Sequence, residues 1–133
     1  MPLDGLQRIG FAIAARDVAA LREFYVTHLG FEVEVEFAEP AYVILALQGV
    51  RLSIAEQGHP AGDLPDYTMT AQPEPHLPAA MLILEVADCA SQYDRLRAAG
   101  VQPASELHRP AWGGARFFIT DPEGNLIEFE ELA

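Results

Sequence analysis

Few residues of this sequence combine a type and a spacing that could do chemistry. The four histidines, His28, His59, His76 and His108, have no partner at metal-binding spacing. The single cysteine, Cys89, opens a predicted helix, where the helix dipole could activate a thiol; its place on the inward helix face favours core packing instead. The sequence also lacks a glycine-rich phosphate loop, a nucleophile elbow, a Cys-x-x-Cys pair and a zinc-protease helix motif. No established catalytic constellation is present in these patterns.

The segment HRPAWGGAR, residues 108–116, is better suited to contact a ligand. Trp112 offers a flat ring for stacking, and the two glycines after it would let the backbone approach a bound molecule closely. Packing at a dimer edge is the alternative for Trp112. His108 is either a hydrogen-bonding, pH-sensitive group at a cleft or a solvated strand end. Arg116 either meets a ligand or forms an internal ion pair with Glu128, which would otherwise anchor a cationic group or make buried hydrogen bonds.

The elements that must position these residues begin with a strand, a capped helix and three further strands. The strand RIGFAIAARD leads to Asp17, a plausible N-cap for the helix VAALREFYVTHL, whose apolar residues have helical spacing. Gly30 ends this helix. The strands FEVEVEF, AYVILAL and, after the turn at Gly49, RLSIAE follow it.

The second half repeats this order of signals. The strand AAMLILEVAD leads to Asp88, the helix CASQYDRLRAA ends before Gly100, and a short strand is expected at residues 104–108, before ARFFIT, a turn and NLIEFEE. Asp17 and Asp88 are 71 residues apart, Gly30 and Gly100 are 70 apart, and Gly49 and the turn residue Gly124 are 75 apart. A near-constant offset with the same element order indicates an internal repeat.

We therefore predict an α+β fold of two βαβββ modules, residues 1–57 and 79–133, within one compact domain. Residues 58–78 form a Pro-rich linker, because five prolines exclude a regular helix or strand there. This linker is long for so small a domain, so it is either a lid or arm that packs on another subunit, or an idle connector.

Composition limits the classes of partner. The 133 residues carry 8 basic and 20 acidic side chains, for a net charge of -12, so nucleic acid is not an expected partner and a cationic molecule would be attracted. The longest apolar run, residues 41–47, is far shorter than the roughly 20 residues of a membrane span. With no secretory pattern in MPLDGLQR and a single cysteine, we expect a cytoplasmic protein without membrane contact.

Two phrases, RDVAALREFYVTHLGFEV and FFITDPEGNLIEFEE, closely resemble the vicinal-oxygen-chelate superfamily of glyoxalases, bleomycin-resistance proteins and extradiol dioxygenases. The matching features are an acidic helix cap, a Phe-Tyr pair, Leu-Gly-Phe at the helix end, and Asp-Pro-x-Gly-Asn before a strand with a glutamate. The segment PAWG, residues 110–113, and the nearby Arg116 resemble the Pro-Trp-Gly and nearby arginine of the bleomycin-resistance branch. The resemblance implies an open barrel-like sheet around a ligand cleft, and a homodimer. Phe37 and Tyr42 would lie at the rim of that cleft, with core packing as the alternative for Phe37.

Metal-dependent members of the superfamily hold a divalent ion at four strand positions. The repeat assigns these positions to Gly10, Ser53, Met81 and Glu128, of which Glu128 alone is a strong ligand for such an ion. A shift by one residue brings in no histidine. We therefore expect no metal or other cofactor at these positions.

These observations favour a metal-independent binding protein that sequesters a bulky aromatic or cationic small molecule, as in drug or metabolite resistance. Whether the protein is an enzyme stays open. The alternative is a metal-dependent lyase, isomerase or dioxygenase with an unconventional site. The expected ligand-contacting residues are Phe37, Tyr42, His108, Trp112, Arg116 and Glu128.

Overall fold

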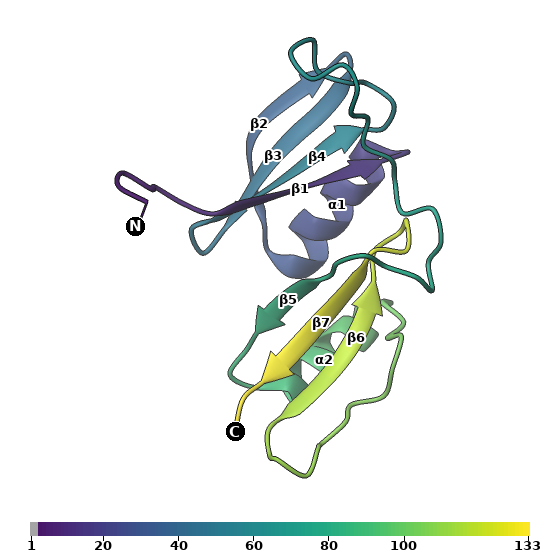
Figure 1. Ribbon diagram of the computed structural model, residues 1–133. Helices are drawn as coiled ribbons and strands as arrows, with labels where there is room; N and C mark the ends of the chain where they lie inside the picture. Colours follow the sequence, from purple (N-terminus) through teal and green to yellow (C-terminus); the bar gives the residue numbers. More distant parts are fainter. Residues whose placement is uncertain (1–2) are drawn as a thin grey trace. The chain divides into compact units, whose positions relative to one another are not determined.

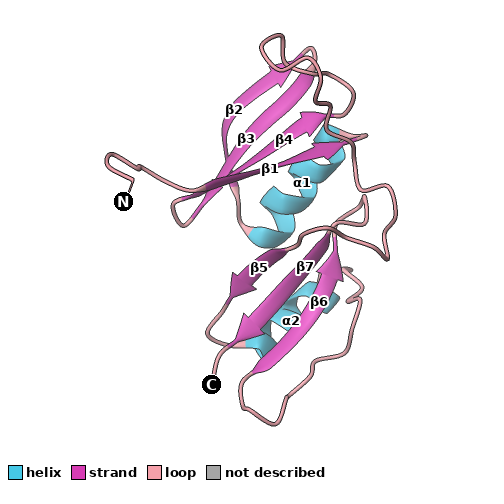
Figure 2. Cartoon of the chain, in the orientation of Figure 1, coloured by secondary structure: helices cyan, strands magenta, loops and turns pink. Residues whose placement is uncertain are grey.

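The structure, a computed structural model, describes residues 3–133, and residues 1 and 2 of the predicted first module lie outside it (Figure 1). The chain forms two compact units, Met1–Pro73 and Glu74–Ala133. In each unit one helix packs on one sheet (Figure 2). No helix among residues 3–133 is both long and apolar enough to cross a bilayer.

The first unit has the predicted order of strand, helix and three strands. Its elements are β1 (Gly10–Ala15), α1 (Val18–Leu29), β2 (Glu32–Ala38), β3 (Ala41–Leu47) and β4 (Val50–Glu56). The sheet order is β1-β4-β3-β2, with β1 parallel to β4 and the other pairs antiparallel. Asp17 caps α1 by accepting a hydrogen bond from the Ala20 N–H at 3.0 Å, and Gly30 ends it with a φ of 80°. Both predicted ends of this helix are confirmed.

Strand alternation gives the sheet of the first unit two different faces. Val43 and Leu45 of β3 and Leu52 and Ile54 of β4 are buried beneath α1. Their neighbours in sequence must point to the opposite face, because successive side chains of a strand alternate. That opposite face carries the polar side chains Tyr42, Arg51 and Ser53, among others.

The second unit is smaller than predicted. It contains β5 (Leu82–Glu85), α2 (Cys89–Ala98), β6 (Ala115–Thr120) and β7 (Leu126–Glu131) in a three-stranded sheet of order β5-β7-β6. Asp88 caps α2 as predicted, accepting from the Ser91 N–H at 3.1 Å. The core beneath α2 includes stacked rings of Phe117 and Phe129, whose centroids are 4.8 Å apart.

The strand predicted at residues 104–108 is wrong, because only an isolated bridge between His108 and Arg116 forms there. Ala104 donates to the Phe118 carbonyl at 2.8 Å, as a strand residue would. The Phe118 N–H, however, donates to the Ser105 hydroxyl at 3.0 Å. A side-chain oxygen has thus replaced the backbone carbonyl that a fourth strand would supply, which interrupts the ladder and leaves the second module as βαββ.

Strand register supports the repeat that the sequence offsets indicate. In the first unit Ala12 of β1 lies opposite Ser53 of β4. In the second, Ile83 of β5 lies opposite Glu128 of β7, again in a parallel pair. The offsets of 71 and 75 residues therefore relate structurally equivalent positions.

Most of the predicted linker belongs to the first unit. Residues 58–73 form no helix or strand but fold back on that unit. Gly58 donates to the Met69 carbonyl at 3.3 Å, and the buried Ala71 donates to the Gln57 side chain at 3.0 Å. Arg16 donates to the Gln72 carbonyl at 3.1 Å. This part of the linker is therefore an ordered arm on its own unit.

Candidate ligand-binding site

The sheet of the first unit is hollowed on the face opposite α1. The hollow has a volume of about 380 Å³ and is open to solvent. Its volume is within the roughly 300–1,000 Å³ of typical small-molecule sites. The lining residues come from the segment before β1 and from β1, β3 and β4: Arg8, Gly10, Phe11, Ala12, Tyr42, Arg51 and Ser53.

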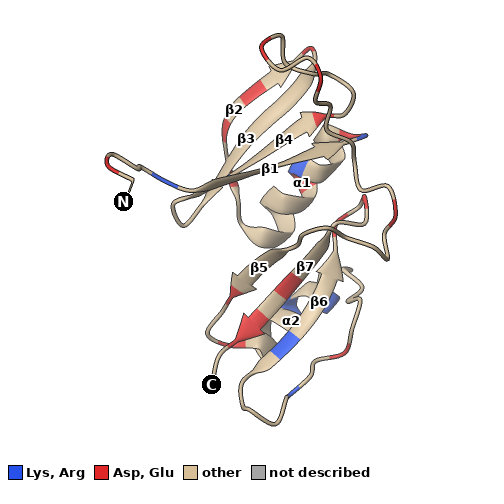
Figure 3. Cartoon of the chain, in the orientation of Figure 1, with Lys and Arg blue, Asp and Glu red and all other residues tan. Residues whose placement is uncertain are grey.

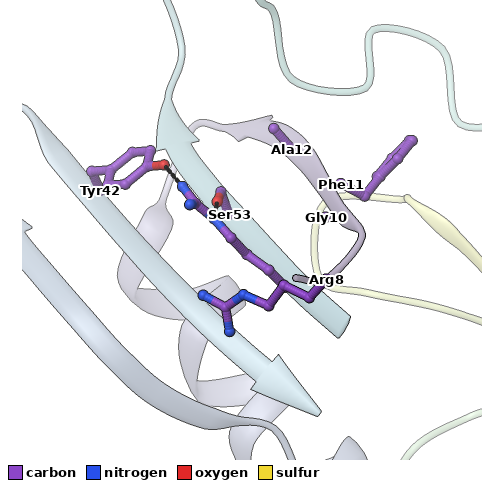
Figure 4. A pocket seen from close by; sticks show the side chains of 7 residues that line it. Arg8, Gly10, Phe11, Ala12, Tyr42 and Ser53 are labelled. Atoms are coloured by element: carbon purple, nitrogen blue, oxygen red, sulfur yellow. Dashed lines mark hydrogen bonds between the residues drawn. The ribbon is translucent and has the colours of Figure 1, made fainter. Parts of the chain in front are cut away.

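Arg51 is the central polar group of this hollow. Its Nε donates to the Ser53 hydroxyl at 2.8 Å, and its Nη2 donates to the Tyr42 hydroxyl at 2.9 Å. Figure 4 shows Tyr42 and Ser53 among the side chains that line the hollow. Arg51 and Ser53 share a face because they are two residues apart on β4, and Tyr42 reaches them from the adjacent strand β3. Two hydrogen bonds at different nitrogens fix the plane of the guanidinium. Its Nη1 has no hydrogen-bond partner within residues 3–133 and remains available to a ligand.

A second arginine, Arg8, forms an ion pair with Glu34. Its two terminal nitrogens donate to the two carboxylate oxygens at 2.8 and 2.7 Å. Arg8 precedes the edge strand β1, while Glu34 lies on β2 at the other edge of the sheet, so the pair links the two edges. The hydrogen bonds from Arg8, aided by the positive charges of Arg8 and Arg51, lower the pKa of Glu34, which is therefore ionised at neutral pH.

The local charge of the hollow is opposite in sign to that of the chain. Acidic segments dominate both units in Figure 3, in keeping with the net charge of -12. Among residues 3–133, in contrast, the charged residues that line the hollow are Arg8 and Arg51. Glu34 is engaged by Arg8, so the charge of Arg51 is left without a carboxylate partner among the described residues.

The two residues predicted for the cleft rim are brought together in this unit. The rings of Phe37 and Tyr42 are 6.2 Å apart between centroids and inclined at 45°. Phe37 is 58% exposed, so its alternative role in the core is wrong. Both rings also border a second hollow of about 370 Å³, between the start of α1 and the β2–β3 hairpin. Tyr42 is thus common to both hollows.

The other four predicted residues belong to the second unit. Arg116 and Glu128 lie on the adjacent strands β6 and β7, at positions that alternate with the residues buried beneath α2. His108 and Arg116 exchange backbone hydrogen bonds of 2.9 Å in both directions, and the His108 side chain is exposed. Trp112 is 54% exposed in the loop before β6. The guanidinium of Arg116 lies 5.7 Å from the centre of the Phe118 ring.

Glu128 is a buried carboxylate that no ion pair neutralises within residues 3–133. It is 5% exposed, and the alternative of an Arg116–Glu128 ion pair is not formed in the described structure. Burial raises the pKa of Glu128, as does repulsion by Glu130, while Arg116 partly opposes this. Arg116 lies opposite Glu130 in the β6–β7 register.

The two glycines after Trp112 serve the packing of the chain itself. Gly114 has a φ of 72°, and a Cβ built on it would lie 2.1 Å from the carbonyl oxygen of Glu131. A Cβ on Gly113 would lie 2.8 Å from the side chain of Ala133. The sequence interpretation assigned these glycines to close approach by a ligand, whereas here the close approach is made by the C-terminal residues Glu131 and Ala133.

The positions at which the superfamily holds a metal present a poor donor set. Gly10 has no side chain, and the Ser53 hydroxyl accepts a hydrogen bond from a guanidinium instead of facing a cation-binding cavity. Met81 precedes β5, and Glu128 is the one carboxylate of the set. No group of three or more His, Cys, Asp or Glu residues that could hold a metal ion occurs within residues 3–133. These residues do not fit a divalent ion.

The sequence interpretation missed Arg51 and Arg8. A signal for Arg51 was present, because RLSIAE alternates polar and apolar residues and so places Arg51 and Ser53 on one face of a strand. No comparable signal marks Arg8, which lies outside the strands. Its role depends on Glu34, which a β-bulge between Val33 and Val35 leaves as an extra residue on β2.

Comparison with known structures shows that this arrangement of elements is common. The chain is similar to a lactoylglutathione lyase from Agrobacterium tumefaciens, with a TM-score of 0.74 and 20% identity over 98% of this chain and 96% of that one. It is similar to TnmS3, an antibiotic binding protein from Streptomyces sp. CB03234, with a TM-score of 0.70 and 19% identity over 100% and 99% of the two chains. TioX from Micromonospora sp. ML1 matches with a TM-score of 0.73 and 22% identity over 95% and 98%.

At these identities the structural likeness shows the fold alone. No curated protein matches the sequence significantly. A family model described as Glyoxalase/Bleomycin resistance protein/Dioxygenase superfamily matches residues 6–129, which is nearly the whole chain. Sequence motifs, fold and family model agree, and the chain belongs to the glyoxalase, bleomycin-resistance protein and dioxygenase superfamily.

Proposed function

We propose that this protein binds a bulky aromatic small molecule in the hollow of its first unit, without a metal, and protects the cell by sequestering that molecule. The observation that carries the proposal is the hollow itself. It combines a polar group held in place, the guanidinium of Arg51, with the aromatic surface of Tyr42. Apolar walls with a few well-placed polar groups are typical of small-molecule sites.

The antibiotic-binding neighbour supports this class of function. TnmS3 has the same fold and is an antibiotic binding protein. Of the aromatic and cationic ligands expected from the sequence, the positive charge of the hollow favours the aromatic one. A cation would be attracted by the chain as a whole but repelled locally by Arg51.

Binding measured in the presence of a chelator tests the proposal. We expect planar aromatic compounds to bind saturably in isothermal titration calorimetry with EDTA present, and to raise the melting temperature. Elemental mass spectrometry of protein purified without metal-affinity steps should find no stoichiometric transition metal. Stoichiometric metal together with metal-dependent turnover would replace this proposal with the enzymatic alternative.

A pair of aromatic substitutions locates the site. Phe11→Ala should weaken binding roughly 2- to 10-fold, because Phe11 lines the hollow that contains Arg51 and an aromatic contact contributes about 0.5–1.5 kcal/mol. Phe11 is 50% exposed, so the loss should come without unfolding. Tyr67→Ala is the matched control, because Tyr67 is also exposed in the first unit and borders neither hollow. Equal affinities for both variants would place the ligand elsewhere.

The homodimer expected from the resemblance stays a prediction. Light scattering coupled to size-exclusion chromatography would give the mass of the particle in solution. A mass twice that of the 14.5 kDa chain is the expected result.

A further inference from the structure

Gly10 makes room for the side chain of Arg51. The two residues are register partners on the parallel strands β1 and β4, and Arg51 donates its backbone N–H to the Ile9 carbonyl at 3.0 Å. A Cβ on Gly10 would lie 3.3 Å from both the Cβ and the carbonyl oxygen of Arg51, and 3.5 Å from its Cδ. A larger side chain at residue 10 would therefore crowd both the arginine stem and the backbone of β4.

Both of the superfamily's ligand positions in this unit are thus used by one guanidinium. Gly10 provides space for the stem, and Ser53 accepts a hydrogen bond from Nε. Tyr42 accepts from Nη2. A fixed positive charge with free donors therefore occupies this part of the unit, where metal-dependent relatives carry ligands for a cation.

The carboxylate of Glu34, whose pKa is lowered by its hydrogen bonds from Arg8 and in part by the charge of Arg51, is already engaged by Arg8. Glu34 accepts two hydrogen bonds from Arg8, and the ion pair holds its pKa low. Arg51 has no carboxylate within 4 Å among the described residues. A partly buried guanidinium with free N–H donors binds carboxylates and phenolates strongly, because such hydrogen bonds are charge-assisted.

We propose that Arg51, seated beside Gly10 and held by Ser53 and Tyr42, is an oxyanion anchor that selects planar aromatic acids. This inference rests on the proposed function and names the ligand class of the same hollow. The guanidinium receives a carboxylate or phenolate oxygen at Nη1, while the aromatic ring of the ligand lies against Tyr42. The anchor excludes the corresponding aromatic bases.

Three probes that share one ring system test the selectivity by calorimetry with EDTA present. They are 2-naphthoate, its neutral amide 2-naphthamide, and the cation 2-naphthylmethylammonium. Wild-type protein should bind 2-naphthoate at least 10-fold more tightly than 2-naphthamide, since a hydrogen bond to a charged group contributes about 1.5–3 kcal/mol. The ammonium probe should bind most weakly.

Two substitutions should change this selectivity in opposite directions. Arg51→Gln should bring the affinity for 2-naphthoate down to that for 2-naphthamide and leave the amide little affected. Glu34→Gln should strengthen 2-naphthoate binding, because it removes a carboxylate that interacts electrostatically with Arg51. Arg97→Gln, an arginine on α2 outside the hollow, is the charge-matched control and should leave all three affinities unchanged. Circular dichroism and melting curves check that each variant is folded.

Gly10→Ala provides a test that keeps the charge. Crowding the stem of Arg51 should reduce the ratio of 2-naphthoate to 2-naphthamide affinity while the protein remains folded. The anchor would be overturned if Arg51→Gln kept the wild-type preference for 2-naphthoate over 2-naphthamide, or if the wild type bound the ammonium probe more tightly than 2-naphthoate. Either result would leave the proposed function intact. Failure of all three probes and of other planar aromatics to bind would overturn both.

Discussion

Replacement of Gly114 by alanine should destabilise the protein severely, for two reasons that can be separated. The φ of 72° disfavours any residue with a Cβ, at a cost of about 1–2 kcal/mol. The new Cβ would also lie 2.1 Å from the Glu131 carbonyl oxygen, which is backbone and cannot swing aside. Moving strand β7 away adds about 1–3 kcal/mol, by analogy with overpacked cores.

The total for Gly114→Ala is about 2–5 kcal/mol, which corresponds to a fall in melting temperature of roughly 6–20 °C for a domain of this size. Two other glycines provide controls. Gly100 has a φ of 87° but open space around it, so Gly100→Ala should show the backbone cost alone. Gly62 has neither a positive φ nor a close neighbour, so Gly62→Ala should be nearly neutral.

Differential scanning calorimetry of the three variants measures these losses directly. The expected order of melting temperatures is Gly62→Ala highest, then Gly100→Ala, then Gly114→Ala. If Gly114→Ala melts within about 2 °C of Gly100→Ala, less than 1 kcal/mol separates them, and the close approach to the C-terminal strand is refuted. The interpretation of Gly114 as a ligand-contacting glycine would then regain its basis.

Three further predictions concern single side chains. Glu128→Gln should stabilise the protein at pH 7 and have little effect at pH 4. Because the pKa of Glu128 is raised in the folded state, the wild type loses stability as the pH rises from the unfolded value of 4.5 through the folded value. Equal gains in stability at both pH values would contradict this. The thiol of Cys89 is buried, and this burial raises its pKa to about 11. It should therefore react with Ellman's reagent at pH 8 only after the protein is denatured. Fast labelling of the folded protein would refute the burial of the thiol. Asp121→Ala should lower the free energy of unfolding, measured in urea, by about 2–4 kcal/mol. The carboxylate accepts hydrogen bonds of 2.8–3.0 Å from the backbone N–H groups of Glu123 and Asn125 and from the Asn125 side-chain amide. A loss below about 1 kcal/mol would show that these hydrogen bonds contribute little.

Local signals in the sequence were sufficient for the helices and for most strands. Asp17 and Asp88 begin the helices because their carboxylates accept hydrogen bonds from N–H groups three residues on. Gly30 ends α1 because its φ of 80° suits a residue without a Cβ. The prediction of a strand at residues 104–108 was wrong because of Ser105. Its hydroxyl accepts a hydrogen bond from the backbone N–H of Phe118, which lies on a strand distant in sequence, and no local pattern specifies such a bond.

The candidate site was only partly predictable for the same reason. Phe37 and Tyr42 were identified because they flank one hairpin, so chain connectivity alone keeps them close. Arg8 and Glu34 come together only when β1 and β2 form the two edges of one sheet, and a β-bulge is needed to place Glu34.

The repeat, the helix caps, the alternation of the strands and the residue types at the superfamily's ligand positions could all be derived from the sequence. These follow from spacing along the chain, and a glycine or serine there is a poor ligand in any fold. Which group stands in the place of the metal ligands could be learned only from the folded structure. The position of Arg51 depends on the register of β1 against β4 and of β3 against β4, which brings Gly10, Ser53 and Tyr42 around one guanidinium. Register is set by the packing of the whole sheet on α1, so the sign of the charge in the hollow could not be derived from composition.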